Sequence, residues 1–291
     1  MTVHLTTSDL LARGAALLAP VLESPGLDAG ILLAFALGIP RVRLKSHPEA
    51  ARSAADLERY LALIERRAGG EPLAYITGRR EFWTLDLRVT PDVLVPRPET
   101  ELLVERGLAL CEAPAARVLD LGTGSGAIAL SLAAERPEWR VLAVDAAPAA
   151  LEVARDNARR LGLTGVEFES GDWFSGLVGR RFDLVLSNPP YVDARDPALR
   201  ALQHEPRQAL TPGEDALADL RAIIRAAPGH LHAGAWLALE HGATQAAAVA
   251  HELVARGFGS VRSHRDLGGH ERVTEGQWIE GRTPASPGSV S

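Results

Sequence analysis

Hydrophobic residues recur at helical spacing over the first part of the chain. Apolar positions between residues 10 and 22 fall three to four residues apart behind possible capping residues at 6–8, which predicts a helix. The same spacing predicts a second helix over residues 27–37 and a third over 53–67. Amphipathic helices of this kind form a small bundle, so we expect residues 1–72 to fold as a separate N-terminal helical domain. Its default role is packing, and recognition of another molecule is the alternative.

The hydrophobic period changes from helical to alternating over residues 73–97. Short apolar runs at 73–76, 84–89 and 93–95 are separated by turns that contain glycine and proline, which predicts strands. We therefore expect residues 73–97 to form a β-hairpin linker between the helical domain and the rest of the chain.

Strands and helices alternate from residue 98 onward. Apolar runs predict strands at 118–121, 140–144, 166–169, 182–187, 236–240, 260–263 and 272–274. The architecture expected over residues 98–279 is therefore α/β, a doubly wound sheet with helices on both faces. The polar stretch 193–215 is longer than an ordinary connection, and we expect it to cover a ligand site. Residues 280–291 are predicted to be a disordered tail.

Composition narrows the class of protein. The chain has 291 residues, which favours about two domains, and 46% of them are hydrophobic. No apolar run approaches the roughly 20 residues of a membrane helix, and the N-terminus lacks the features of a signal peptide. The one cysteine, Cys111, excludes an internal disulfide. We predict a cytoplasmic protein without membrane contact, in which Cys111 is a small buried apolar residue.

The charge balance argues against a nucleic acid partner. The formal net charge is −6, and Lys45 is the one lysine among 31 basic residues. An enzyme that binds a nucleic acid duplex normally has a stripe of basic residues, and none stands out in this chain. Histidines 204, 241, 264 and 270 show no ligand spacing with supporting cysteines, so we expect no metal site.

A glycine-rich turn follows the strand at 118–121. Glycines 122, 124 and 126 allow positive φ and remove Cβ atoms, so a ligand can lie against bare backbone at a helix N-terminus. The next strand ends in Asp145, whose carboxylate can accept hydrogen bonds from a ribose diol. Dinucleotide-binding proteins use the spacing Gly-x-Gly-x-x-Gly, whereas this chain has Gly-x-Gly-x-Gly. Proteins that bind a dinucleotide and proteins that bind a nucleoside-containing methyl donor both use such an acid. These residues therefore do not decide which of the two ligands is bound.

The tetrapeptide Asn188-Pro189-Pro190-Tyr191 follows the strand predicted at 182–187 and indicates the chemistry. One side-chain carbonyl and one main-chain carbonyl can accept the two N–H groups of an amide or an exocyclic amine, and the aromatic ring can fix its plane. This arrangement favours methyl transfer to nitrogen over hydride transfer. Near it, Asp172 and Trp173 follow a short strand and could bracket an adenine, through the carboxylate and the indole face respectively.

The segment Pro96-Arg97-Pro98-Glu99-Thr100-Glu101 precedes a helix predicted to run to about Cys111. The helix dipole favours acidic residues in a first helical turn, so Glu99 and Glu101 are most simply residues that stabilise the helix start. The alternative is a lid over a methyl donor. The pattern leaves the roles of Arg97, Glu99 and Glu101 open.

Taken together, these motifs resemble those of the HemK/PrmC peptide-release-factor glutamine methyltransferases. The resemblance covers nearly the whole chain, and the Pro96–Glu101 segment is more specific than the glycine turn. His270 lies where the family more often has another polar residue. The residues that support the resemblance are Glu71–Gly78, Glu81-Phe82, Val93–Glu101, Asp120–Gly126, Asn188–Tyr191, Glu240–Gly242 and Asp266–Val273.

The resemblance implies a Rossmann-like class I methyltransferase fold and methylation of N5 of the glutamine in the Gly-Gly-Gln motif of class I release factors. S-adenosyl-L-methionine would be the donor and S-adenosyl-L-homocysteine the product. By position, Asn188, Pro189 and Tyr191 would be catalytic, and Asn188, Pro189, Pro190 and Tyr191 would hold the substrate amide. Donor binding would fall to Gly122, Thr123, Gly124, Ser125, Gly126, Asp145, Trp173 and Asn188.

Rival functions share these motifs. A DNA adenine-N6 methyltransferase presents an exocyclic amine to the same tetrapeptide by base flipping. A glutamine methyltransferase that acts on a ribosomal protein is a closer alternative, and a catalytically silent nucleotide-binding adaptor is the non-enzyme alternative. We expect a monomer whose partner is a release factor and whose residues 1–72 recognise that substrate.

Overall fold

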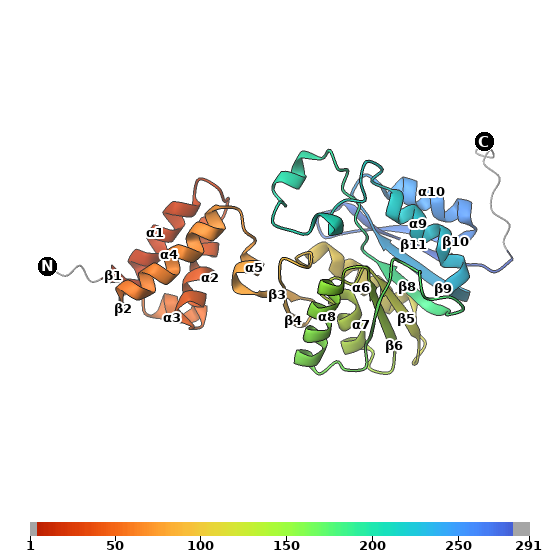
Figure 1. Cartoon of the computed structure of the whole chain (residues 1–291), viewed down its shortest axis with the longest axis horizontal. Helices are drawn as coiled ribbons and strands as arrows, with labels where there is room; N and C mark the ends of the chain where they lie inside the picture. Colours follow the sequence, from red (N-terminus) through yellow and green to blue (C-terminus); the bar gives the residue numbers. More distant parts are fainter. Residues whose placement is uncertain (1–4, 282–291) are drawn as a thin grey trace. The chain divides into compact units, whose positions relative to one another are not determined.

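The structure of the protein is a computed structural model that describes residues 5–281. The chain divides into two compact units, one ending at Arg79 and one beginning at Arg80. Figure 1 shows the helices and strands of both units along the chain. Of the tail predicted over 280–291, residues 282–291 lie outside the described residues.

The first unit is helical. The helices predicted over 27–37 and 53–67 are confirmed to within two residues. A short helix at 41–46 was not predicted, because its two apolar residues, Val42 and Leu44, are too few to show a period. The elements are α1 (Thr7–Leu18), α2 (Pro25–Leu37), α3 (Arg41–Ser46), α4 (Ala54–Ala68) and α5 (Leu73–Thr77), with β1 (Leu5–Thr6) paired antiparallel to β2 (Ala51–Arg52).

Side chains at their ends explain where these helices begin. Thr6 caps α1 and Ser53 caps α4, each in a capping box with an aspartate three residues on. Helix α2 starts with Pro25 in its first turn and ends at Gly38, whose φ is 63°. Pro25 therefore begins a helix and does not simply interrupt one.

Helices α1, α2 and α4 pack around Tyr60. Its side chain is fully buried, and its hydroxyl donates a hydrogen bond to the Ala29 carbonyl oxygen at 3.2 Å. The hydroxyl lies so close to α1 that a Cβ at Gly14 would be 1.8 Å from it. Gly14 therefore sets how closely α1 and α4 can approach.

Two strands predicted in the linker are wrong. Residues 73–77 form helix α5, because Pro72 precedes the segment and Gly78, with φ at 73°, ends it. Val93–Val95 are not a strand. The Val95 N–H donates to the Glu205 carboxylate at 3.0 Å, so it does not pair with a neighbouring strand.

The strand predicted at 84–89 is confirmed and forms one half of a hairpin, whose other half comes from residues 79–82. Strands β3 (Arg79–Phe82) and β4 (Leu85–Arg88) pair, and the turn between them places Trp83 at a positive φ of 54°. The Trp83 N–H donates to Glu101 at 2.9 Å and its indole N–H to Glu135 at 2.8 Å. These two carboxylates hold the strained turn in place.

The second unit contains a seven-stranded sheet, which confirms the predicted α/β doubly wound fold. The strand order is β10-β11-β9-β8-β5-β6-β7, in which β10 and β11 run antiparallel to their neighbours and the others are parallel. Its strands are β5 (Arg117–Leu121), β6 (Arg140–Asp145), β7 (Glu167–Ser170), β8 (Phe182–Ser187), β9 (Leu231–Glu240), β10 (Phe258–Arg265) and β11 (Glu271–Trp278). The helices are α6 (Glu101–Leu110), α7 (Ala127–Glu135), α8 (Pro148–Leu161), α9 (Ala218–Ala226) and α10 (Ala246–Arg256), with short 3-10 turns at Pro98–Thr100, Pro197–Arg200, Arg207–Ala209 and Ala227–His230.

Both faces of the central strands are buried. In β5, Val118 packs into one hydrophobic cluster with α6, α7 and α8, whereas Leu119 packs into a second cluster with α9 and α10. Figure 1 shows these two groups of helices on opposite sides of the sheet. Buried Cys111, directly after α6, belongs to the first cluster, as predicted. Because polar groups have no room on either face, they collect at the carboxyl edge of β5, β6, β7 and β8.

The close approach at Gly14 gives a test of the helical unit. We expect Gly14→Ala to lower its stability by about 2–3 kcal/mol, because the new methyl group collides with Tyr60. Hydrogen exchange of the α1 and α4 amides in the full chain measures this. Gly30→Ala in α2 is the matched control, since its nearest neighbour, Leu11 Cδ2, would be 4.0 Å from the new Cβ. Equal protection in the two variants would contradict this packing.

Candidate active site

A cavity of about 590 Å³ opens in the second unit at the carboxyl edge of the sheet. Most of the residues predicted to bind a donor line it, from four separate segments of the chain. Gly126, Pro189 and Tyr191 are not in its lining. The predicted residues in the wall are Gly122, Thr123, Gly124, Ser125, Asp145, Trp173, Asn188 and Pro190.

The glycine loop, Gly122–Gly126, forms the floor of this cavity. A Cβ on Gly124 would meet nothing within 4 Å, so open space lies over the backbone there. Gly126 caps helix α7 with φ at 85°, and a Cβ there would be 2.9 Å from Leu130. Gly124 therefore exposes its backbone to the cavity. Gly126 lets helix α7 begin directly after the loop, where a larger residue would collide with Leu130.

Asp120 supports the loop from below, and sequence reasoning assigned it no role. Its carboxylate is fully buried and accepts hydrogen bonds from the Thr123 hydroxyl at 2.6 Å and the Ala129 N–H at 3.2 Å. Burial raises the pKa of Asp120 to about 7, although both hydrogen bonds oppose the shift. An acid inside an otherwise apolar strand is the signal that could have identified it.

Asp145 ends β6 beside the loop. Its carboxylate accepts hydrogen bonds from the Gly124 N–H at 2.8 Å and the Ala147 N–H at 2.9 Å. Burial raises the pKa of Asp145, and these backbone donors oppose the shift. Each carboxylate oxygen keeps a lone pair for a further donor in the cavity.

Trp173 forms a side wall of the cavity. Its φ of 49° turns the chain after β7, and its ring lies 3.4 Å from the position of a Cβ on Gly122. Burial and the charge of Asp172 raise the pKa of Asp219, which also lines the cavity, whereas a hydrogen bond with Trp173 lowers it. The indole is thus held in place by packing on the glycine loop.

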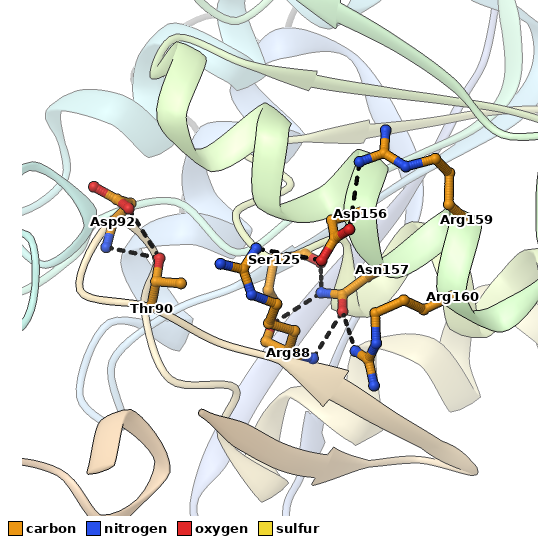
Figure 2. Close-up of polar contacts among 8 residues, drawn as sticks. All are labelled: Arg88, Thr90, Asp92, Ser125, Asp156, Asn157, Arg159 and Arg160. Carbon is orange, nitrogen blue, oxygen red and sulfur yellow. Dashed lines mark hydrogen bonds and ion pairs between the residues drawn. The ribbon is translucent and has the colours of Figure 1, made fainter. Parts of the chain in front are cut away.

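Asn157 of α8 ties the glycine loop to the hairpin, as Figure 2 shows. Its amide nitrogen donates to the Ser125 and Arg88 carbonyl oxygens, each at 2.9 Å. Its amide oxygen accepts from the Arg88 N–H at 2.7 Å and from Arg160 at 3.2 Å. All four hydrogen-bonding positions of this buried amide are therefore used, and they fix the loop relative to β4.

Glu205 joins two walls of the cavity. Its carboxylate accepts from the Val95 N–H at 3.0 Å and from the Arg97 guanidinium at 2.5 Å, and its side chain is 2% exposed. Pro96 and Arg97 line the cavity, and so do residues 206, 208 and 209, which follow Glu205 in the chain. The 193–215 stretch, predicted to cover a ligand site, thus contributes to the same cavity as the glycine loop. Nothing in the local sequence pattern identified Glu205.

The Asn-Pro-Pro-Tyr loop, residues 188–191, is anchored at both ends. The Asn188 amide nitrogen donates to the Thr100 hydroxyl at 3.1 Å, and the Tyr191 hydroxyl donates to Glu240 Oε1 at 3.2 Å. Gln245 donates to the Tyr191 carbonyl oxygen at 3.0 Å. Thr100 and Glu240 are therefore polar partners of the loop that sequence reasoning missed.

Glu240 ends β9 with its side chain buried. Burial raises the pKa of Glu240 to about 7, although the Thr100 and Tyr191 hydroxyls and the charge of Arg272 oppose the shift. Burial and the charge of Glu240 also raise the pKa of Tyr191, although the charge of Arg272 opposes the shift, so its phenol stays protonated. The site can therefore orient polar groups at neutral pH without a strongly basic side chain.

Comparison with known proteins identifies the family. A family model described as the PrmC N-terminal domain matches residues 9–78, and one described as a methyltransferase small domain matches residues 98–218. The release factor glutamine methyltransferase of Pseudomonas aeruginosa is 50% identical over 261 residues, which are 89% of this chain and 95% of that protein. That of Xylella fastidiosa is 48% identical over 254 residues, 86% of this chain and 92% of that protein.

The chain belongs to the release factor glutamine methyltransferase family. The predicted resemblance to HemK/PrmC proteins is thereby confirmed, and the chain is an enzyme of the protein-glutamine methyltransferase class.

Solved structures of more distant proteins agree on the fold of this family member. A methyltransferase from Pyrococcus furiosus superposes with a TM-score of 0.53 at 19% identity, over 73% of this chain and 96% of that chain. The hMettl16 catalytic domain in complex with MAT2A 3'UTR hairpin 1 reaches 0.57 at 17% identity, over 81% and 84%. At these identities the likeness shows the fold alone.

Residues 5–281 contain neither a candidate membrane helix nor a cluster of metal-binding side chains. No helix in this range is long and apolar enough to cross a membrane. No group of three or more His, Cys, Asp or Glu side chains in the same range is arranged to hold a metal ion. His241 instead contacts the Thr274 hydroxyl at 2.7 Å and the Gly242 carbonyl oxygen at 2.9 Å.

The buried Glu240 predicts a dependence of stability on pH. Its pKa rises from the ordinary glutamate value of 4.5 to about 7 on folding, so its contribution to stability is present below pH 4.5 and is lost as pH rises through 7. Between pH 5 and pH 8 this loss amounts to roughly 2–3 kcal/mol. We expect Glu240→Gln to remove that part of the slope when the free energy of unfolding is measured by chemical denaturation. Parallel curves for the two proteins would refute the assignment.

Proposed function

We propose that the enzyme transfers the methyl group of S-adenosyl-L-methionine to N5 of the glutamine in the Gly-Gly-Gln motif of class I release factors. Family membership at 45–50% identity to several release factor glutamine methyltransferases supports this activity. The observation that carries it at the site is the orientation of Asn188. Its amide nitrogen is bonded to Thr100, so its amide oxygen remains an acceptor at the wall of the cavity.

The cavity suits the donor. Open space over Gly124 accommodates a group laid against backbone, and the free lone pairs of Asp145 suit a ribose diol. The Trp173 ring offers an apolar face for adenine, with Asp172 beside it for the exocyclic amine. When bound, S-adenosyl-L-methionine supplies an electrophilic methyl group, and S-adenosyl-L-homocysteine leaves.

The acceptor amide nitrogen is a poor nucleophile, because its lone pair is delocalised into the carbonyl group. In the proposed mechanism the Asn188 amide oxygen and the Pro189 carbonyl oxygen accept its two N–H groups. Pro190 keeps the turn rigid, and Tyr191 packs on the glutamine. Catalysis then depends on holding nitrogen in line with the methyl group, an orientation effect that reaches effective molarities of about 10⁵ M or more in well-oriented systems.

The proposal extends to the organisation of the chain. Residues 1–72 are assigned to recognition of the release factor, 73–97 to a linker that contains the hairpin, and 98–279 to methyl transfer. Donor binding is assigned to the glycine loop with Thr123 and Ser125, to Asp145 and Trp173, and to Asn188. The enzyme is proposed to act as a monomer in the cytoplasm.

The acceptor can be identified directly. Enzyme incubated with donor labelled in its methyl group is mixed separately with a release factor, ribosomal proteins or DNA, and the label is then located by mass spectrometry. Label on the glutamine of Gly-Gly-Gln supports the proposal. Label confined to a ribosomal protein glutamine or to adenine would replace it with one of the rival activities, and donor binding without labelling would favour an adaptor.

Asn188→Ala tests the central residue. We expect turnover on a release factor to fall by about 10²-fold or more. The substrate amide would lose a hydrogen-bond acceptor that holds its nitrogen in line with the methyl group. The donor Kd, measured by calorimetry, should stay within about fivefold, since most donor contacts lie elsewhere in the cavity. Near-normal methyl transfer by this variant would contradict the mechanism.

Glu205→Gln tests the link between the cavity walls. The substitution keeps the shape of the side chain but removes its charge-assisted bond to Arg97, so the loop at 193–215 should loosen over the donor. We expect the donor Kd to rise by about tenfold. Glu214→Gln, an exposed position in the same loop, is the matched control and should leave it unchanged. Equal affinities in the two variants would show that the link does not affect donor binding.

A further inference from the structure

The glutamine directly before helix α10 connects the turn after β9 to the Asn-Pro-Pro-Tyr loop. The Gln245 amide oxygen accepts a hydrogen bond from the Gly242 N–H at 2.8 Å, and its amide nitrogen donates to the Tyr191 carbonyl oxygen at 3.0 Å. A main-chain N–H can only donate and a main-chain carbonyl can only accept. The two partners therefore determine which way round the Gln245 amide lies.

The peptide group between Tyr191 and Val192 is held at both of its polar atoms. Gln245 donates to its carbonyl oxygen, and its N–H, which belongs to Val192, donates to the Leu210 carbonyl oxygen at 3.0 Å. Because a peptide group is planar, it cannot turn without breaking at least one of these two bonds. The backbone orientation at Tyr191 is therefore fixed, and Gln245 is the side-chain partner in this arrangement.

The turn after β9 also holds the Tyr191 side chain. The Tyr191 hydroxyl donates to Glu240 Oε1 at 3.2 Å. A Cβ at Gly242 would lie 3.6 Å from Tyr191 Cδ2 and 3.1 Å from Gln245 Oε1, so the turn packs closely against both side chains. Glu240 thus holds the tyrosine at its hydroxyl and Gln245 holds it at its main chain, which leaves the plane of the ring little freedom.

We propose that Gln245 is a positioning residue that fixes the plane of the Tyr191 ring, on which the acceptor glutamine packs. The inference rests on the proposed function, which assigns that contact to Tyr191. Gln245 is not among the residues that line the cavity, and in this scheme it touches neither donor nor acceptor. It acts through the Tyr191 main chain, and the absence of a side chain at Gly242 leaves room for its amide.

Gln245→Glu tests the inference, because it keeps the length of the side chain and replaces the amide nitrogen with oxygen. An ionised carboxylate cannot donate to the Tyr191 carbonyl oxygen, whereas a protonated carboxyl group has one O–H to donate. We expect kcat/KM for an intact release factor to be at least about tenfold below that of the wild type at about pH 8. The ratio of variant to wild type should rise about fivefold or more at about pH 5.5, where the introduced carboxyl group is protonated. Glu240 and His241, the titratable groups of the same turn, are present in both proteins, so the ratio removes their direct effect.

Two further variants serve as controls. Gln245→Met keeps the length of the side chain but cannot donate at any pH, so its loss of kcat/KM should be the same at both pH values. Gln277→Glu removes a matched bond from a glutamine amide to the Gly234 carbonyl oxygen, 2.9 Å long and near the opposite end of β9, and should leave kcat/KM unchanged.

A purely structural role for Gln245 would give a different result. Both Gln245 variants would then have lower melting temperatures and weaker donor binding, and Gln245→Glu would show no recovery at low pH. We expect instead a donor Kd within about twofold of the wild type. A ratio for Gln245→Glu that does not change with pH would overturn the inference.

The wild-type enzyme separates this inference from the function on which it rests. If wild-type enzyme leaves the Gly-Gly-Gln glutamine unmethylated, the proposed function fails, and the inference fails with it. If the wild type methylates that glutamine and Gln245→Glu does so at the same rate at about pH 8, the proposed function stands and the positioning role alone is overturned.

Discussion

Burial of strand β5 on both faces is the constraint on which the rest of the structure depends. Val118 faces one hydrophobic cluster and Leu119 the other, so the strand leaves no polar surface until it ends. The neighbouring parallel strands follow the same rule, and their polar residues also appear where they end. The polar segments therefore meet at the carboxyl edge of the sheet, because its two faces are filled by apolar side chains. These segments are the glycine loop, Asp145, Trp173 and the Asn-Pro-Pro-Tyr loop.

Hydrogen bonds between distant segments then give these loops fixed positions. Asn157 holds the glycine loop to the hairpin, Glu205 holds the 193–215 stretch to the Val95–Arg97 backbone, and Thr100 holds Asn188. Each of these three side chains is buried or nearly so. A buried hydrogen bond costs much more to leave unmade than an exposed one, so each connection restricts its loop to one arrangement. These connections therefore help to shape the cavity at the edge of the sheet.

Sequence reasoning recovered what local pattern encodes. The strands from β5 to β11 follow from apolar runs and alternation, and the two ligand motifs follow from residue types at strand ends. The run at 73–76 was misjudged because four consecutive apolar residues fit a strand or a helix, and only the flanking Pro72 and Gly78 decide. The connections through Asn157, Thr100 and Glu205 span 69, 88 and 110 residues, and no local pattern encodes pairings at that separation.

Two buried carboxylates lower the stability of the fold but accept hydrogen bonds that the site needs. Asp120 lies inside β5 and Glu240 ends β9, and burial raises the pKa of each to about 7, so keeping them ionised at neutral pH costs stability. A neutral amide would fit the same space at lower cost. It would also bring an N–H donor, and the hydroxyl groups of Thr123 and Tyr191 would lose a carboxylate acceptor. Asp120 therefore orients the Thr123 hydroxyl in the glycine loop, and Glu240 orients the Tyr191 hydroxyl in the Asn-Pro-Pro-Tyr loop, so the cost of burying these two acids accompanies the arrangement of both loops.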